Sequence, residues 1–222
     1  MNGPFSLLGA AGGLAVIAVA SCAPATQRSS APSIPPPSAA QTDGPTGAQG
    51  KQGGAYTPAD VYFMSGMIGH HAQAVLMAGW APSHGASEAV RALCERIVVG
   101  QRDEIVLMQR WLGERHEPVP DADASHDMMP GMGHAMMPGM LTAEQLAELD
   151  RARGADFDRL FLSFMIRHHQ GAIVMVNQLF GSPGGGEQET VFRFASDVYA
   201  DQTTEIDRMQ KLLVVLITGN QP

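Results

Sequence analysis

A segment of nineteen residues occurs twice in this chain and constrains the fold more than any other feature of the sequence. Segments 60–78 and 158–176 both carry the pattern Met-Ile-x-His-His within an apolar stretch. At an offset of 98 residues, the identical pairs include Asp60/Asp158, Phe63/Phe161, Met67/Met165, Ile68/Ile166, His70/His168, His71/His169, Ala74/Ala172 and Met77/Met175. The apolar residues of the first copy recur in steps of three and four, which predicts a helix with one buried seam.

The segments that follow each copy also correspond, at an offset of 101 residues. Gln101, Glu104, Ile105, Met108, Gln109 and Leu112 match Gln202, Glu205, Ile206, Met209, Gln210 and Leu213. Short turns at 82–87 and 181–186 make the two helices of each half antiparallel neighbours, and the long link between halves allows a crossover. We therefore expect an all-α fold, a four-helix bundle made of a duplicated helix hairpin.

Capping signals set the expected helix ends. Thr57 and Asp60 form a capping-box pattern with Pro58 at the first helical position, and Thr142 opens a short helix. Asp156 is expected to cap the third long helix. The expected long helices are about 57–79, 87–112, 157–180 and 188–216. They give a folded domain over 55–217, with halves at 57–112 and 156–217 and a Met/His-rich loop at 114–141.

The N-terminal residues resemble an export signal. An apolar run of fourteen residues over 7–20 is too short to span a bilayer comfortably, and Val19-Ala20-Ser21-Cys22 resembles a bacterial lipobox. Residues 1–22 are thus predicted to be a signal peptide with Cys22 as the lipidated residue. The apolar run departs from the usual pattern because no Lys or Arg precedes it. An uncleaved signal anchor is the alternative. Residues 23–54 are rich in Pro, Ser and Gly, which predicts a disordered tether. The domain is expected outside the cytoplasm, lipid-anchored at the cell membrane or periplasmic or secreted.

The net charge and the distribution of methionine and histidine indicate which classes of partner to expect. A formal net charge of −8 argues against a nucleic-acid partner. Six of the fourteen methionines fall within 128–140, where Pro and Gly prevent a regular helix, so we expect a mobile loop that presents thioethers. The candidate metal-capture residues of this loop are His126, Met128, Met129, Met132, His134, Met136, Met137 and Met140.

The four paired histidines are expected to meet near the middle of the bundle. Counting back from each turn places Gln101 and Gln202 at their height, with Glu104 and Glu205 about one turn (~5 Å) away. These four side chains are the candidate supports of the site. The candidate metal ligands, which share the faces of the two repeats, are His70, His71, His168, His169, Met64, Met67 and Met165. Neighbouring residues on a helix point about 100° apart, so either histidine of a pair could be the metal ligand. We favour His71 and His169 as the ligands, because they lie on the buried seam of each helix.

Three interpretations of these residues compete. Imidazole with thioether suits thiophilic ions such as Cu(I) and Ag(I), which favours an exported copper-binding protein, not an enzyme, that sequesters or hands over the metal. A ferritin-like dimetal oxidoreductase is the second interpretation, although no Glu-x-x-His pattern lies on the expected long helices. The third is a structural bundle whose core histidines bind no metal. Cys94 lies in the apolar stripe of its helix and is expected to be a core residue.

The second repeat also resembles a known family. The motif Phe161-Leu162-x-x-Met165-Ile166-x-His168-His169-Gln170-Gly171-Ala172, preceded by Met137-Pro138-Gly139-Met140-Leu141-Thr142, is similar to that of the domain of unknown function 305. The resemblance covers about 56–216. It implies a ferritin-like four-helix bundle found in exported bacterial proteins, linked in some members to copper binding or tolerance. The first repeat departs from the motif, with Gly69-His70-His71-Ala72-Gln73 in place of Arg167-His168-His169-Gln170-Gly171.

Overall fold

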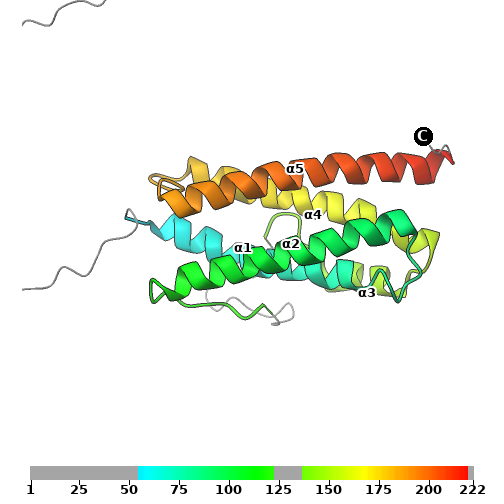
Figure 1. Ribbon diagram of the computed structural model, residues 1–222, viewed down its shortest axis with the longest axis horizontal. Coiled ribbons are helices and arrows are strands. Elements are labelled where there is room, and N and C mark those ends of the chain that lie inside the picture. Colours follow the sequence, from blue (N-terminus) through cyan, green and yellow to red (C-terminus); the bar gives the residue numbers. More distant parts are fainter. Residues whose placement is uncertain (1–54, 123–136, 220–222) are drawn as a thin grey trace, which may run out of the picture. The chain divides into compact units, whose positions relative to one another are not determined.

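The computed structural model describes residues 55–122 and 137–219, and these residues form five helices and no strand (Figure 1). The helices are α1 (Pro58–Gly79), α2 (Glu88–Gly113), α3 (Ala143–Arg151), α4 (Ala155–Gly181) and α5 (Glu189–Thr218). The all-α prediction is confirmed over this part of the chain. The signal peptide with Cys22, the tether, and the loop residues His126, Met128, Met129, Met132, His134 and Met136 lie outside the described residues.

The four long helices lie side by side (Figure 1). α1 packs along α2, α4 packs along α5, and the two hairpins meet where α1 contacts α4. The short helix α3 contacts α4. Within the described residues, no helix is both long enough and apolar enough to cross a membrane.

The helix starts follow the capping signals at two of the three predicted positions. At α1 the Asp60 backbone N–H donates to Oγ1 of Thr57 (3.3 Å) and the Thr57 N–H donates to Oδ2 of Asp60 (2.7 Å). Thr142 begins α3 with an equivalent capping box. The prediction that Asp156 caps α4 was wrong, because the cap residue is Gly154, which has φ of 58° and makes no side-chain cap bond. A link of only three residues separates α3 from α4, and a positive φ at glycine turns the chain back within it.

Two buried aspartates tie each half to the turn of the other half. Oδ1 of Asp60 in α1 accepts the backbone N–H of Gly186, just before α5, at 2.7 Å. Asp158 in α4 accepts the N–H of Ser87, the cap residue of α2, at 3.1 and 3.3 Å. Hydrogen bonds to charged groups contribute about 1.5–3 kcal/mol each. The aspartate at the start of each repeat is therefore a reciprocal link between the halves.

The core consists of two apolar clusters separated by one polar level. One cluster contains residues 74–78 of α1 and 157–165 of α4, and the other contains residues 63–68 of α1 and 172–179 of α4. α2 and α5 also contribute to both clusters, on either side of Gln101 and Gln202. Cys94 is buried in the first cluster, and burial raises the pKa of its thiol to about 12, in agreement with a core role.

Candidate metal centre

Six buried polar side chains form the level between the two apolar clusters. This level, called the histidine layer below, consists of His70 and His71 from α1, Gln101 from α2, His168 and His169 from α4, and Gln202 from α5. Each side chain is at most 3% exposed. The residues that the repeats single out thus share one level of the helix assembly.

His70 and His168 face each other across the contact between α1 and α4. Their ring centroids are 3.8 Å apart and the rings are inclined by 40°. The Nε2–H of His70 donates to the carbonyl of Pro138 at 3.0 Å, since a carbonyl oxygen can only accept. The neutral His70 ring therefore carries its lone pair on Nδ1. Within the described residues, this Nδ1 and both ring nitrogens of His168 have no hydrogen-bond partner.

Burial keeps both of these rings uncharged. It lowers the pKa of His70 to about 3, with a further contribution from His71, while the bond to Pro138 acts in the opposite direction. Burial, followed by His70 and His169, lowers the pKa of His168 well below its ordinary value. A neutral imidazole with an unpaired nitrogen is a good metal ligand, and a buried nitrogen without a partner is unusual in proteins. The pair has the donor character of a metal site.

His71 and His169 point to carboxylates instead. Nε2 of His169 lies 2.6 Å from Oε2 of Glu205 in a hydrogen bond, and Nε2 of His71 lies 2.7 Å from Oε2 of Glu104. The second contact is short, but its angle is not that of a hydrogen bond. Burial lowers the pKa of His169, and Glu205 opposes this effect. A carboxylate that fixes the tautomer of a histidine is a common support of metal ligands. Nδ1 of both rings has no hydrogen-bond partner in the part of the chain that the structure describes.

These contacts divide each His-His pair by role. The seam positions His71 and His169, favoured as ligands from the sequence, approach Glu104 and Glu205, whereas the tilted rings of His70 and His168 contact each other. The expected support residues Glu104 and Glu205 thus reach the histidines directly. Gln101 and Gln202 lie at the level of the histidines, and neither polar atom of the Gln101 side chain has a partner among the described residues.

The candidate ligands Met64, Met67 and Met165 lie in the core and are fully buried. Met64 and Met67 belong to one apolar cluster and Met165 to the other, so they lie on opposite sides of the histidine layer. Among the described residues, no three His, Cys, Asp or Glu side chains are close enough together to hold a metal ion.

Residues 137–141, called the docked segment below, cover the histidine layer on the side of α1 and α4. The Leu141 N–H donates to Oε1 of Gln73 (2.7 Å), and Nε2 of Gln73 donates to the Leu141 carbonyl (3.1 Å). Opposite, Gly171 lies so close to the Pro138 backbone that a Cβ at residue 171 would collide with it. The expectation of a mobile loop is therefore wrong for 137–141, because Gln73 and Gly171 hold this part against the helices.

Neither Gln73 nor Gly171 was recognised as functional from the sequence, although one signal was available. The two residues occupy the same position of the repeat, and they differ where the flanks of the histidine pairs differ. Met137 and Met140 are half-buried in the docked segment, and the sulfur of Met137 lies beside Gly66, one turn before His70. A single segment that docks across a nearly symmetric pair of helices requires different residues on the two sides.

The comparison with protein families decides the classification. The family model described as "Domain of unknown function (DUF305)" matches residues 60–213, which includes both repeats and the docked segment. This chain belongs to the DUF305 family. A comparison with curated proteins finds no match for this DUF305 protein.

Solved structures of similar proteins include DUF305 proteins and a copper-binding protein. A DUF305 fragment from Deinococcus radiodurans is 31% identical, with a TM-score of 0.60, and covers 71% of this chain and 97% of its own. A presumed secreted DUF305 protein from Streptomyces coelicolor is 29% identical, with a TM-score of 0.59 and coverage of 71% and 93%. CopM in its Cu(II)-bound form is 29% identical, with a TM-score of 0.56 and coverage of 69% and 95%. CopM has also been solved bound to Cu(I), at 27% identity and a TM-score of 0.52.

Proposed function

We propose that this DUF305 protein is an exported copper-binding protein that holds Cu(I), or Ag(I), at the histidine layer for sequestration or hand-over, and that it is not an enzyme. One observation carries the proposal: four buried imidazoles at one level, each with an Nδ1 that has no partner in the described part of the chain. Leaving these nitrogens unpaired costs stability in the apo protein, and a bound ion would offset that cost.

Ligand chemistry favours a soft ion. Uncharged imidazole nitrogens and thioether sulfurs bind Cu(I) well, and a thioether remains a ligand without losing a proton. Met67, Met165 and Met64 lie within the flanking apolar clusters, and Met137 of the docked segment lies one turn from His70. The similarity to CopM, which has been solved with Cu(I) and with silver, supports the same choice of metal.

The finer description of the fold is part of the proposal. We infer a ferritin-like four-helix bundle over 55–217, made of two copies of a helix hairpin. The matching contacts of Asp60 and Asp158 with the turns of the opposite half support it, as does the side-by-side packing of α1, α2, α4 and α5.

Export and membrane attachment are proposed from the sequence. The lipobox-like Val19-Ala20-Ser21-Cys22 supports a lipid anchor on Cys22, and the tether over 23–54 suits a domain held at a membrane surface. The Met/His-rich residues of 126–140 are proposed to capture the ion first. Met137 and Met140 would then pass it to the layer that the docked segment covers.

A dimetal oxidoreductase is the second candidate, because His71–Glu104 and His169–Glu205 are imidazole–carboxylate pairs on four different helices. It predicts bound iron or manganese and oxygen-dependent turnover. Metal analysis of the purified protein separates it from the copper proposal.

The direct test is a competition for Cu(I) between the protein and a chromogenic chelator. We expect the variant with His70, His71, His168 and His169 all changed to Ala to lose most of its ability to compete, while circular dichroism shows the helices retained. Equal competition by wild type and variant would rule out the histidine layer as the copper site. Deletion of 126–136, which leaves the docked segment in place, measures the contribution of the remaining loop separately.

A further inference from the structure

The four histidines of the layer are closed off from solvent. None of their side chains is more than 1% exposed. A metal ion or any other reagent that reaches these rings therefore needs part of the protein to move. Two parts of the structure cover the layer: the docked segment beside α1 and α4, and the side chains of α2 and α5 on the other side.

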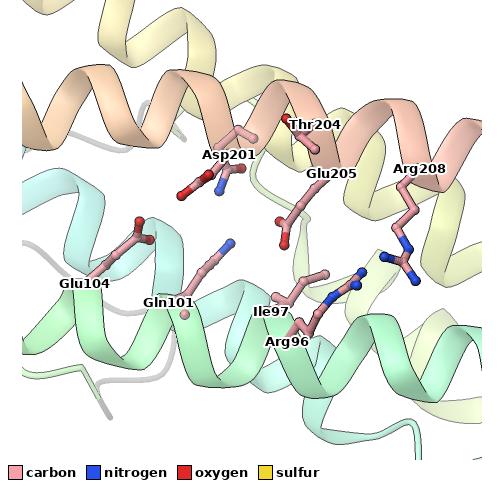
Figure 2. Close-up of a pocket in the computed structure, with 10 residues that line it drawn as sticks. Arg96, Ile97, Gln101, Glu104, Asp201, Thr204, Glu205 and Arg208 are labelled. Carbon is pink, nitrogen blue, oxygen red and sulfur yellow. The ribbon is translucent and has the colours of Figure 1, made fainter.

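The side of α2 and α5 carries a groove that does not reach the imidazoles. Charged side chains of the two helices face each other across it, and none of the four histidines lines it (Figure 2). Gln101 lines the groove, but both polar atoms of its side chain are buried. Glu104 and Glu205 also line it, and their carboxylates stand between the groove and the two histidines that they contact. Access from this side requires movement of helices that pack in both apolar clusters.

The docked segment is attached to α1 through one side chain that makes two bonds. Gln73 donates to the Leu141 carbonyl at 3.1 Å and accepts the Leu141 N–H at 2.7 Å. The Leu141 side chain is buried in the core, whereas residues 137–140 are only half-buried. Gln73 therefore holds the backbone where a core residue meets a more exposed part of the chain.

On α4 the docked segment lies against bare backbone. A Cβ at Gly171 would collide with the Pro138 backbone, and a Cβ at Gly139 would collide with the carbonyls of residues 167 and 168. Gly139 has φ of 80°, a conformation that glycine adopts without strain. A short stretch held by a few hydrogen bonds opens at a lower free energy than helices held by an apolar core. The docked segment is thus the cover that moves more easily.

We propose that the docked segment gates the histidine layer and that Gln73 is its latch. In the closed state the Pro138 carbonyl occupies His70. When Gln73 releases the backbone of Leu141, residues 137–140 swing away while the Leu141 side chain stays in the core. The inference rests on the proposed copper site, for which it supplies the route of entry and release, but the gate opens with or without an ion.

Diethyl pyrocarbonate tests the gate on the purified, metal-free full-length protein, because it modifies an unprotonated imidazole only where the ring can be reached. Mass spectrometry gives the rate at each histidine. In the wild type, the exposed His116 should react fast and the buried His70 slowly. Gln73→Leu should raise the rate at His70 about tenfold or more, since it removes two hydrogen bonds of the closed state. Gly171→Ala should also raise it, because its Cβ displaces the segment.

Two controls separate gating from general loosening. Gln210→Leu makes the same exchange at an exposed position of α5 and should leave the rate at His70 unchanged. His84 is buried at the turn between α1 and α2, where it contacts Asp150, and it should react slowly in every variant. With Cu(I) bound, Gln73→Leu should transfer the ion to a chelator faster than the wild type does, by a factor similar to that at His70.

Three results would overturn the proposal. One is a wild-type rate at His70 in both Gln73→Leu and Gly171→Ala while circular dichroism shows the helices retained. Another is an equal rise at His84. The third is reaction of His71 and His169 before His70 in the wild type, which would place the route through the groove. If Gln73→Leu does not fold, Gly171→Ala and the order of reaction in the wild type decide.

The gate and the copper site fail separately. Modification of the metal-free protein reports the gate alone, whereas the chelator competition described above reports whether copper binds at the layer. Copper that binds but leaves Gln73→Leu at the wild-type rate would overturn the gate as the route of the ion.

Discussion

The two sides of the histidine layer differ in both chemistry and packing. On the side of α1 and α4, the docked segment covers the layer with backbone carbonyls and the thioether of Met137. On the side of α2 and α5, carboxylates line an open groove. Adjacent histidines on one helix diverge by about 100°, so each His-His pair places one ring toward each environment. A closed side that contains a thioether and an open side that contains carboxylates thus lie on either side of a single repeated dipeptide.

The largest expected effect is that of pH on the closed side. The pKa of His70 is about 3 in the folded protein, below its ordinary 6.5, so as the pH falls below 6.5 the unfolded chain takes up a proton that the folded chain does not. Folding stability should therefore be independent of His70 above pH 6.5 and should fall by about 1.4 kcal/mol per pH unit between pH 6.5 and 3 from this group alone.

Urea denaturation of the metal-free protein at a series of pH values measures this loss. The lowered pKa values of His168 and His169 act in the same direction and steepen the curve. His70→Gln should give a shallower dependence than wild type. Parallel curves would mean that His70 is accessible to protons in the folded state and that the closed side is not closed.

The next effect concerns the docking of 137–141. Gly171→Ala places a Cβ against the Pro138 backbone, so it should displace the segment and destabilise the protein by about 1–3 kcal/mol. Gly100→Ala is the matched control, since it lies within α2 with nothing near the added Cβ. It should stabilise the protein by about 0.5–1 kcal/mol, because alanine has the higher helix propensity. Opposite signs in urea denaturation support the close approach, and two stabilising changes would contradict it.

Features that depend on local sequence patterns could be predicted, whereas features that depend on contacts between distant residues could not. The repeats, the short turns and the capping residues Thr57 and Thr142 depend on local patterns, and they gave the helices and the common level of the histidines. The cap of α4 at Gly154 depended on the short link between α3 and α4, which no local pattern in the sequence indicates. The roles of Gln73 and Gly171 depend on a segment some thirty to seventy residues away in the chain, so only the assembled fold reveals them.

On the open side, we expect Glu104→Gln with Glu205→Gln to weaken Cu(I) binding about 10–100-fold if His71 and His169 are among the ligands, because a carboxylate support raises the basicity of its histidine. Chelator competition with the purified double variant measures this change. An unchanged affinity would mean that His70 and His168 alone bind copper, and that Glu104 and Glu205 do not support the copper site.

The smallest effect should come from Met137, at the edge of the closed side. Met137→Leu keeps the volume of the side chain but removes the sulfur, so stability should change by less than about 1.5 kcal/mol. A Cu(I) affinity that falls while urea stability is unchanged would show that the thioether is a ligand. If both stay unchanged, Met137 only packs against Gly66.

The bonds of Asp60 and Asp158 make each helix hairpin incomplete by itself. The N–H of Ser87 in the first half is satisfied by Asp158 of the second half, and that of Gly186 in the second half by Asp60 of the first. A chain cut between the halves would expose both carboxylates and both amides until the pieces found each other again. Two copies of one hairpin, related by a two-fold axis, could supply the same pair of bonds to one another. The contacts between the halves of this single chain therefore have the reciprocal pattern of an interface between two identical subunits.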